Sequence, residues 1–328
     1  MNLLRRLTLR QLEVFVEAAR SLNLSRAAET LHLTQPAVSM QIRQLEDNVG
    51  LPLFERIGRG RRLTEAGERL LLHASRLLGE VRDAEQAMQA LKGLAGGRVT
   101  VGLVSTAEYF APKLLAEFSR RHPAVDVRFL VGNREALVRL LRDADIDIAV
   151  MGRPPPEVET ASEPLAGNPH VLVASGRHPL VGRRHIDLHS LRGEAFLMRE
   201  AGSGTRLMME ELFRTHLLRP LKLITLGSNE TIKQAVIAGL GISLLSLHAL
   251  GLELRAGEIA VLDVFGLPMQ RIWHVVHLRA RVLSPAAGAF RRFLIEHTQA
   301  RLAEDFVGLP QPPIPARARA ARRSASAE

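Results

Sequence analysis

The chain has 328 residues, more than one hydrophobic core usually organises, so two or three folding units are expected. The formal net charge of +10 favours a polyanionic partner such as nucleic acid, although an Arg-rich proteome would give the same charge. The absence of cysteine excludes disulfides, thiolate metal sites and cysteine nucleophiles. Since there is no signal-like start and no run of about 18 apolar residues, we expect a cytoplasmic protein without membrane contact.

A helix-turn-helix is predicted near the N-terminus. Residues 9–21 place apolar side chains at helical spacing, which indicates an amphipathic helix. Ser25 is expected to cap a short second helix, and Thr34 to cap a third helix that ends at Gly50. Two short helices, a tight turn and a third helix with a polar outer face predict a helix-turn-helix with its core at 24–43. An ordinary three-helix bundle is the alternative.

The N-terminal end of the third helix is the part that we expect to enter a major groove. Glutamine can make a bidentate contact with adenine, and arginine can contact guanine or a phosphate. Proline and methionine offer apolar contact to a thymine methyl group. The residues of this unit expected to contact DNA are Ser25, Arg26, Thr34, Gln35, Pro36, Ser39, Met40 and Arg43.

The DNA-binding unit, residues 1–64, ends in a predicted wing. Leu53-Phe54 and Leu63 can pair as two short strands, with glycines in the turn between them. The turn is rich in arginine, which suits contact with phosphates or a minor groove and carries little sequence information. The wing residues expected at DNA are Arg56, Arg59 and Arg61.

Residues 65–94 predict one long linker helix. Apolar residues recur at alternating spacings of four and three, which is a heptad pattern. A helix of about 28 residues is roughly 42 Å long and cannot bury both sides in a small winged domain. We therefore expect it to pair with a second copy, so that a two-fold dimer reads an inverted repeat; packing on the chain's own following domain is the alternative. The predicted dimer contacts are Leu70, Leu77, Val81 and Met88.

Residues 95–305 alternate short β-rich runs with amphipathic helices, which predicts an α/β domain with parallel βαβ units. Ligands of open α/β sheets bind beyond the carboxyl ends of strands, and helix N-termini favour anions. Hydroxyl and amide side chains gather at three such junctions, although these side chains also cap helices. Together the junctions predict a carboxylate or phosphate ligand between two subdomains. The expected ligand residues are Ser105, Thr106, Asn133, Ser203, Thr205, Arg206, Ser228 and Asn229.

The sequence has no GxSxG, GxxxxGK[ST], HExxH or complete GxGxxG motif, so we expect neither catalysis nor a resident cofactor. No metal site is expected at the spaced histidines, since His274 and His277 fall in a strand-like run. Residues 306–328 contain Pro, Ala and Arg with almost nothing to bury, and are expected to be a disordered tail. A solute-binding or enzymatic α/β protein with an incidental basic N-terminus is the rival from another class.

Residues 7–66 closely resemble the LysR-type transcriptional regulators, through the stretch LTLRQLEVFVEAARSLNLSRAAETLHLTQPAVSMQIRQLEDNVGLPLFERIGRGRRLTEAG. The resemblance implies an α/β protein with a winged helix-turn-helix, a linker helix and a two-lobed periplasmic-binding-protein-like effector domain. It also implies homodimers that assemble as tetramers, DNA bending and effector-tuned contact with RNA polymerase. The implied lobes span 95–165 with 272–305 (lobe I) and 166–271 (lobe II).

Within that family, the chain looks most like regulators of the RuBisCO (Calvin-cycle) operon. The matching stretches are HLTQPAVSMQIRQLEDNVGLPLFERIG, REAGSGTR, LGSNETIKQAVIAGLGISLLSLHAL and IWHVVHLRARVLSPAAGAF. This resemblance implies an effector such as NADPH, ribulose bisphosphate or another phosphorylated metabolite. Our hypothesis is an activator of that operon; a LysR-type regulator of another metabolic operon is the alternative.

Overall fold

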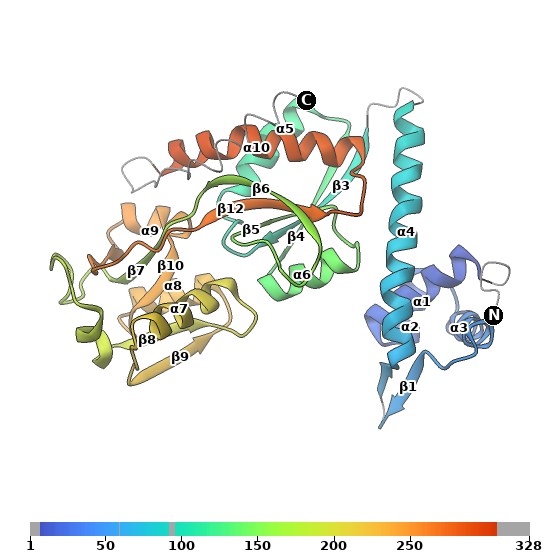
Figure 1. Cartoon of the computed structure of the whole chain (residues 1–328), viewed down its shortest axis with the longest axis horizontal. Helices are drawn as coiled ribbons and strands as arrows, with labels where there is room; N and C mark the ends of the chain where they lie inside the picture. The colour runs from blue at the N-terminus through green and yellow to red at the C-terminus, as the bar shows by residue number, and fades with distance from the viewer. Residues whose placement is uncertain (1–6, 59, 92–95, 307–328) are drawn as a thin grey trace. The chain divides into compact units, whose positions relative to one another are not determined.

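The computed structural model describes residues 7–58, 60–91 and 96–306, which fall into a smaller N-terminal unit and a larger unit that follows (Figure 1). Each unit is described by itself. The predictions for Arg59, for the end of the linker helix and for the tail from 307 onward lie outside the described residues. In the described ranges, no helix combines the length and the apolar character that a membrane span requires.

The smaller unit begins with three helices, as predicted. The Thr34 hydroxyl accepts from the backbone N–H of Ala37, and Gly50 ends the third helix at φ 77°. The prediction that Ser25 caps the second helix is wrong. The helix begins at Leu24, two residues before the start that a Ser25 cap implies, and the side chain of Asn23 accepts from the N–H groups of Ser25 and Arg26. The helices are α1 (Leu9–Ser21), α2 (Leu24–Thr30) and α3 (Gln35–Val49).

The wing and the long helix complete this unit. Strands β1 (Phe54–Ile57) and β2 (Gly60–Leu63) pair antiparallel, with Phe54 opposite Leu63 as predicted. Helix α4 (Glu65–Leu91) follows directly. The apolar faces of α1, α2 and α3 enclose one core together with Leu53 and the start of α4. This core leaves the polar side of α3 on the outside.

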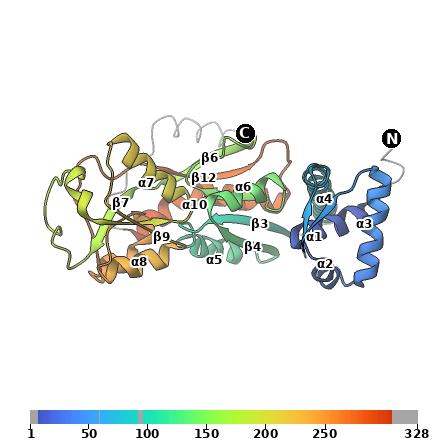
Figure 2. The same cartoon turned by 90° about the horizontal axis from the view of Figure 1, so that it is seen from below.

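Lobe I of the larger unit is a five-stranded sheet in the order β4-β3-β5-β12-β6. Strand β3 runs parallel to β4 and β5, whereas β12 runs antiparallel to β5 and β6. Helices α5 and α10 pack on one face of the sheet and α6 on the other (Figure 2). The bounds are β3 (Gly97–Val104), α5 (Ala111–Arg121), β4 (Val125–Gly132), α6 (Arg134–Arg142), β5 (Ile148–Met151), β6 (Thr160–Gly167), β12 (Ile272–Leu278) and α10 (Pro285–Asp305).

Lobe II is built around two smaller sheets. Strand β7 lies between antiparallel β10 and β11, and β8 pairs parallel with β9. The bounds are β7 (His170–Ser175), η2 (Leu188–Gly193), β8 (Ala195–Arg199), α7 (Gly204–Thr215), β9 (Lys222–Leu226), α8 (Asn229–Ile237), β10 (Ser243–Ser246), η3 (Leu247–Ala249), α9 (Gly251–Arg255) and β11 (Ile259–Val261).

The chain crosses between the lobes twice, and the two crossings are hydrogen-bonded to each other. The backbone N–H of Asn168 donates to the carbonyl of Arg271 (2.7 Å), and that of His170 donates to Met269 (2.9 Å). Strand β6 stays paired with β12 as far as Gly167. The lobe boundary expected after residue 165 falls inside strand β6, which ends at Gly167.

Candidate DNA-contacting surface and effector pocket

The outer face of α3 is open to solvent. Val38, Ile42 and Leu45 point into the core, whereas Met40 keeps 60% of its surface exposed. No other part of this unit covers Met40, so this face of α3 is open within the unit. The other predicted contacts that are exposed here are Ser25, Arg26, Thr34, Gln35, Pro36 and Arg43, while Ser39 is half-buried.

The wing presents two arginines beside α3. Arg56 and Arg61 stand opposite each other in the β1–β2 register and, with Arg43, line a groove of about 210 Å³. Arg62 instead pairs with Glu55. The carboxylate of Glu46 on α3 accepts from the backbone N–H groups of Leu53 (2.8 Å) and Phe54 (3.3 Å), which holds the wing against the helix.

The predicted dimer residues of α4 divide into two kinds. Leu77 and Met88 are 52% and 55% exposed, although both are large apolar residues. Leu70 packs against the core of its own unit, and Val81 is half-buried. Of these four residues, the two exposed ones, Leu77 and Met88, lie in the middle of α4 and near its end.

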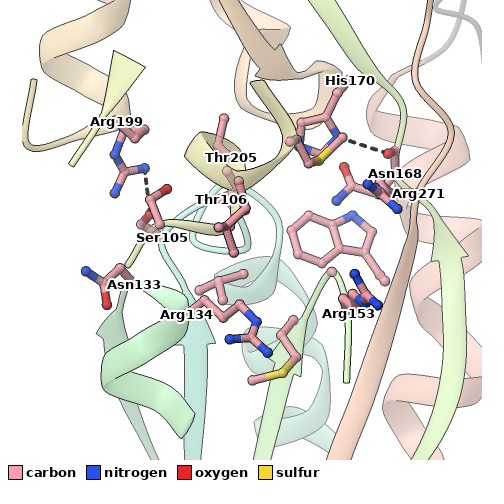
Figure 3. A pocket seen from close by; sticks show the side chains of 18 of the residues that line it. Ser105, Thr106, Asn133, Arg134, Arg153, Asn168, His170, Arg199, Thr205 and Arg271 are labelled. Atoms are coloured by element: carbon pink, nitrogen blue, oxygen red, sulfur yellow. Dashed lines mark hydrogen bonds between the residues drawn. The ribbon is translucent and has the colours of Figure 1, made fainter. Parts of the chain in front are cut away.

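A pocket of about 100 Å³ lies between the two lobes of the larger unit. It opens at the carboxyl ends of β3 and β8 and reaches the two chain crossings (Figure 3). Lobe I contributes Ser105, Thr106 and Asn133, and lobe II contributes Ser203 and Thr205. The structure therefore brings these five predicted residues together.

Several hydroxyl groups in the pocket have no protein partner. Thr106, Ser203 and Thr205 are only 6%, 3% and 7% exposed, and within the described residues their hydroxyls make no hydrogen bond. Ser203 stands at the N-terminus of α7 but does not cap it. These hydroxyls can form hydrogen bonds with a ligand in the pocket, and the free N–H groups of a helix start favour negative charge. This hydroxyl end of the pocket, Thr106, Ser203 and Thr205, is suited to an anionic group.

Arg199 sits at the junction of the two lobes. Its side chain is 3% exposed and pairs with Glu200 at 2.7 Å. It also donates to the Ser105 hydroxyl (3.1 Å) and to the side chain of Asn229 (2.5 Å). Asn229 does not line the pocket itself, but its hydrogen bond positions Arg199, which does.

Two predicted residues face elsewhere. Arg206 pairs with Glu210 at 2.7 Å and does not line the pocket. The Ser228 hydroxyl caps α8 by accepting from the N–H of Thr231 (3.0 Å). Both residues stabilise their own helix. Arg206 forms an ion pair with a glutamate four residues later, and Ser228 caps the helix N-terminus.

The far wall of the pocket contains residues that sequence analysis missed. Burial lowers the pKa of His170 to about 4, so this ring is neutral at physiological pH. Because ligands of open α/β sheets bind beyond the carboxyl ends of strands, sequence analysis could have identified Arg199, which is the last residue of β8. The others belong to no motif: two separate chain crossings bring four of them together, while Arg134 follows β4 and Arg153 follows β5. They are Arg134, Arg153, Asn168, His170, Arg271 and Trp273.

Comparison with known families matches both parts of the chain. A bacterial regulatory helix-turn-helix domain of the lysR family matches residues 9–68, and the LysR substrate binding domain matches residues 92–299.

Individual relatives match over most of the chain. The HTH-type transcriptional regulator CfxR of Cupriavidus necator is 60% identical over 94% of this chain and 97% of its own length. The RuBisCO operon transcriptional regulator of Allochromatium vinosum is 47% identical over 88% of this chain and 95% of its own. Among solved structures, the CcmR regulatory domain of Synechocystis PCC6803 in complex with 2-PG is 37% identical, with a TM-score of 0.58, over 61% of this chain and 96% of that domain. The chain therefore belongs to the LysR family of bacterial DNA-binding transcriptional regulators, which are not enzymes.

Proposed function

We propose that the chain regulates transcription of the RuBisCO carbon-fixation operon, as an activator in the cytoplasm, in response to an anionic metabolite. The observation that carries this proposal is the match to the RuBisCO operon regulator, which extends over both the DNA-binding and the effector domains. A likeness confined to the helix-turn-helix would have supported DNA binding alone.

The DNA-contacting roles follow from the exposed face of α3 and the wing. Gln35, Pro36, Ser39, Met40 and Arg43 would read bases, since the start of such a helix enters the major groove. The sugar-phosphate backbone of the DNA would be contacted by Ser25, Arg26, Thr34, Arg56, Arg59 and Arg61. Two copies joined through α4 would read an inverted repeat, and two dimers would form a tetramer that bends the promoter and contacts RNA polymerase.

The effector would bind between the lobes, with an anionic group at the hydroxyl end. An effector acts only if it binds one lobe arrangement better than another, and a ligand that touches both lobes meets that condition. The candidates are ribulose bisphosphate, another phosphorylated metabolite and NADPH. A cavity of about 100 Å³ favours the smaller ones, because drug-sized ligands occupy pockets of about 300–1,000 Å³.

Two measurements test the proposal. Gel-shift titrations compare a carbon-fixation promoter fragment with a scrambled fragment at several salt concentrations, and we expect the promoter to bind more tightly at each. Thermal melting with sugar phosphates, NADPH and aromatic acids tests the effector class. A melting shift with aromatic acids alone would contradict the assignment to carbon fixation.

A further inference from the structure

The side chain of Glu46 joins the third helix to the wing. It is half-buried near the end of α3, and one of its carboxylate oxygens accepts from the backbone N–H groups of both Leu53 and Phe54. These two N–H groups belong to the first residue of β1 and to the residue before it. A single side chain of α3 therefore binds the wing at the point where the wing begins.

The base of the wing is also tied to the start of α4. The Thr64 hydroxyl donates to the carbonyl of Pro52 (2.7 Å), and its backbone N–H donates to the carbonyl of Leu53 (3.0 Å). Gly67 of α4 lies so close to that second carbonyl that a Cβ at this position would stand 2.2 Å from the oxygen. These contacts fix the wing to α4, whereas the hydrogen bonds of Glu46 fix it to α3.

Glu46 also lines the groove between α3 and the wing. Arg43, three residues earlier on the same helix, lines this groove together with Arg56 and Arg61 of the wing. A carboxylate in this position would repel the phosphates of bound DNA, so its charge by itself opposes binding. A favourable effect of Glu46 on DNA binding must therefore come from its hydrogen bonds to the wing.

We propose that Glu46 is a positioning residue for DNA binding, which fixes Arg56 and Arg61 relative to the reading helix. This inference rests on the proposed function, because it concerns how the proposed DNA contacts are held. Arg56 lies two residues beyond Phe54, and Arg61 stands opposite Arg56 in the β1–β2 register. A wing anchored at Phe54 presents both guanidinium groups in a set place beside α3, so the duplex meets helix and wing as one preformed surface.

Two substitutions of similar size separate position from charge. Glu46→Gln keeps an oxygen acceptor and removes the charge, whereas Glu46→Met removes both. If charge alone mattered, both variants would bind DNA more tightly. We expect Glu46→Gln to bind the carbon-fixation promoter fragment at least as tightly as the wild type, and Glu46→Met to bind it about tenfold more weakly. Asp47→Asn, at the exposed next position of α3, is the control for a lost negative charge and should not weaken binding.

Salt-dependent gel shifts with the full-length protein test whether Glu46 acts through the wing. Each phosphate contact contributes about 0.9 to the slope of log K against log salt concentration. Glu46→Met should therefore lower this slope by up to about two. Arg61→Ala should lower it by about one in the wild type and by clearly less in the Glu46→Met background, because the two changes remove the same contact. Additive changes in slope would overturn the inference.

Hydrogen exchange measures the hold on the wing without DNA. In Glu46→Met the segment that contains Leu53 and Phe54 should exchange faster, while α1 should exchange as in the wild type, which also shows that the variant folds. Weaker promoter binding by Glu46→Gln, or wild-type affinity in Glu46→Met, would overturn the inference and leave the proposed function standing. A wild-type protein that does not prefer the promoter over a scrambled fragment would count against the proposed function, on which the inference rests.

Discussion

The phenol of Tyr109, in lobe I, donates a 2.6 Å hydrogen bond to the carboxylate of Glu230 on α8 of lobe II. Lys233 lies beneath this bond, with its ammonium 4.5 Å from the centre of the tyrosine ring. The same ammonium pairs with Glu230 (2.7 Å) and Glu253 (2.8 Å). This contact joins the lobes beside the pocket, since Ser105 lies in the same turn as Tyr109 and accepts from Arg199.

Tyr109→Phe should weaken effector binding without changing DNA contacts. The change removes one hydrogen bond between the lobes and keeps the ring over Lys233. A bond of this kind contributes about 0.5–1.5 kcal/mol, so the effector Kd should rise about two- to tenfold. Calorimetric titration measures the Kd, and a gel shift without effector serves as the control. An unchanged Kd would show that the bond is not coupled to the ligand-bound lobe arrangement.

Thr205→Val should weaken ligand binding with little change in stability. The Thr205 hydroxyl lines the pocket and has no hydrogen-bond partner among the described residues, so its removal should change the stability of the unliganded protein by less than about 1 kcal/mol. The same change should weaken the effector, which loses a hydrogen-bond donor. Urea unfolding and calorimetry measure the two effects.

Thr298→Val is the matched control for that change. Thr298 is fully buried in α10 and its hydroxyl donates to the carbonyl of Leu294 (2.6 Å). Its replacement should not stabilise the protein and should leave effector affinity unaltered. If both variants respond alike, the hydroxyl of Thr205 has no special relation to a ligand.

Local sequence signals predicted most of the DNA-binding unit. The caps at Thr34 and Gly50 and the wing pairing depend on residues close in sequence, so periodicity and turn chemistry were sufficient. The cap at Asn23 was missed, because asparagine and serine are both good caps and stand two residues apart.

The far wall of the pocket could not be predicted in the same way. Asn168 and Arg271 are 103 positions apart in the sequence, and they meet only because the chain crosses between the lobes twice. Strand β6 carries only a weak sequence signal: it reads TASEPLAG, with a proline and without clear alternation. It is an edge strand paired only with β12, and this position tolerates proline.

Gln35→Ala and Arg61→Ala should affect DNA binding differently. Loss of a base contact by Gln35 should cost about 1–3 kcal/mol on the operator and little on scrambled DNA. Loss of a phosphate contact by Arg61 should weaken both DNAs alike and reduce the salt slope by about one. Salt-dependent gel shifts measure both effects, with Gln44→Ala on the exposed end of α3 as the control. Equal losses on both DNAs for Gln35→Ala would remove its proposed reading role.

Leu77→Glu should dissociate the proposed α4 dimer. Leu77 is half-exposed within its own unit, so a charge there should leave the fold of the unit intact. In a helix pair the same charge would be buried without a partner, which is strongly unfavourable. Sedimentation should therefore show smaller particles and weaker operator binding, whereas Arg76→Glu, one residue away on an exposed position, should change neither. A Leu77→Glu protein that sediments like the wild type would place the dimer contact elsewhere.

Acidification should destabilise the larger unit through His170. Burial lowers the pKa of this ring from 6.5 to about 4. Between these two values the unfolded chain binds more protons than the folded one, so stability falls as the pH falls. The loss attributable to His170 from pH 7 to pH 5 is about 2 kcal/mol. Urea unfolding across this range should give a flatter pH dependence for His170→Asn than for the wild type, even though the variant starts from lower stability. As a control, replacement of the exposed His185 by Asn should leave the dependence of the unfolding free energy on pH as in the wild type. If His170→Asn also keeps the wild-type pH dependence, other groups are responsible for the acid sensitivity.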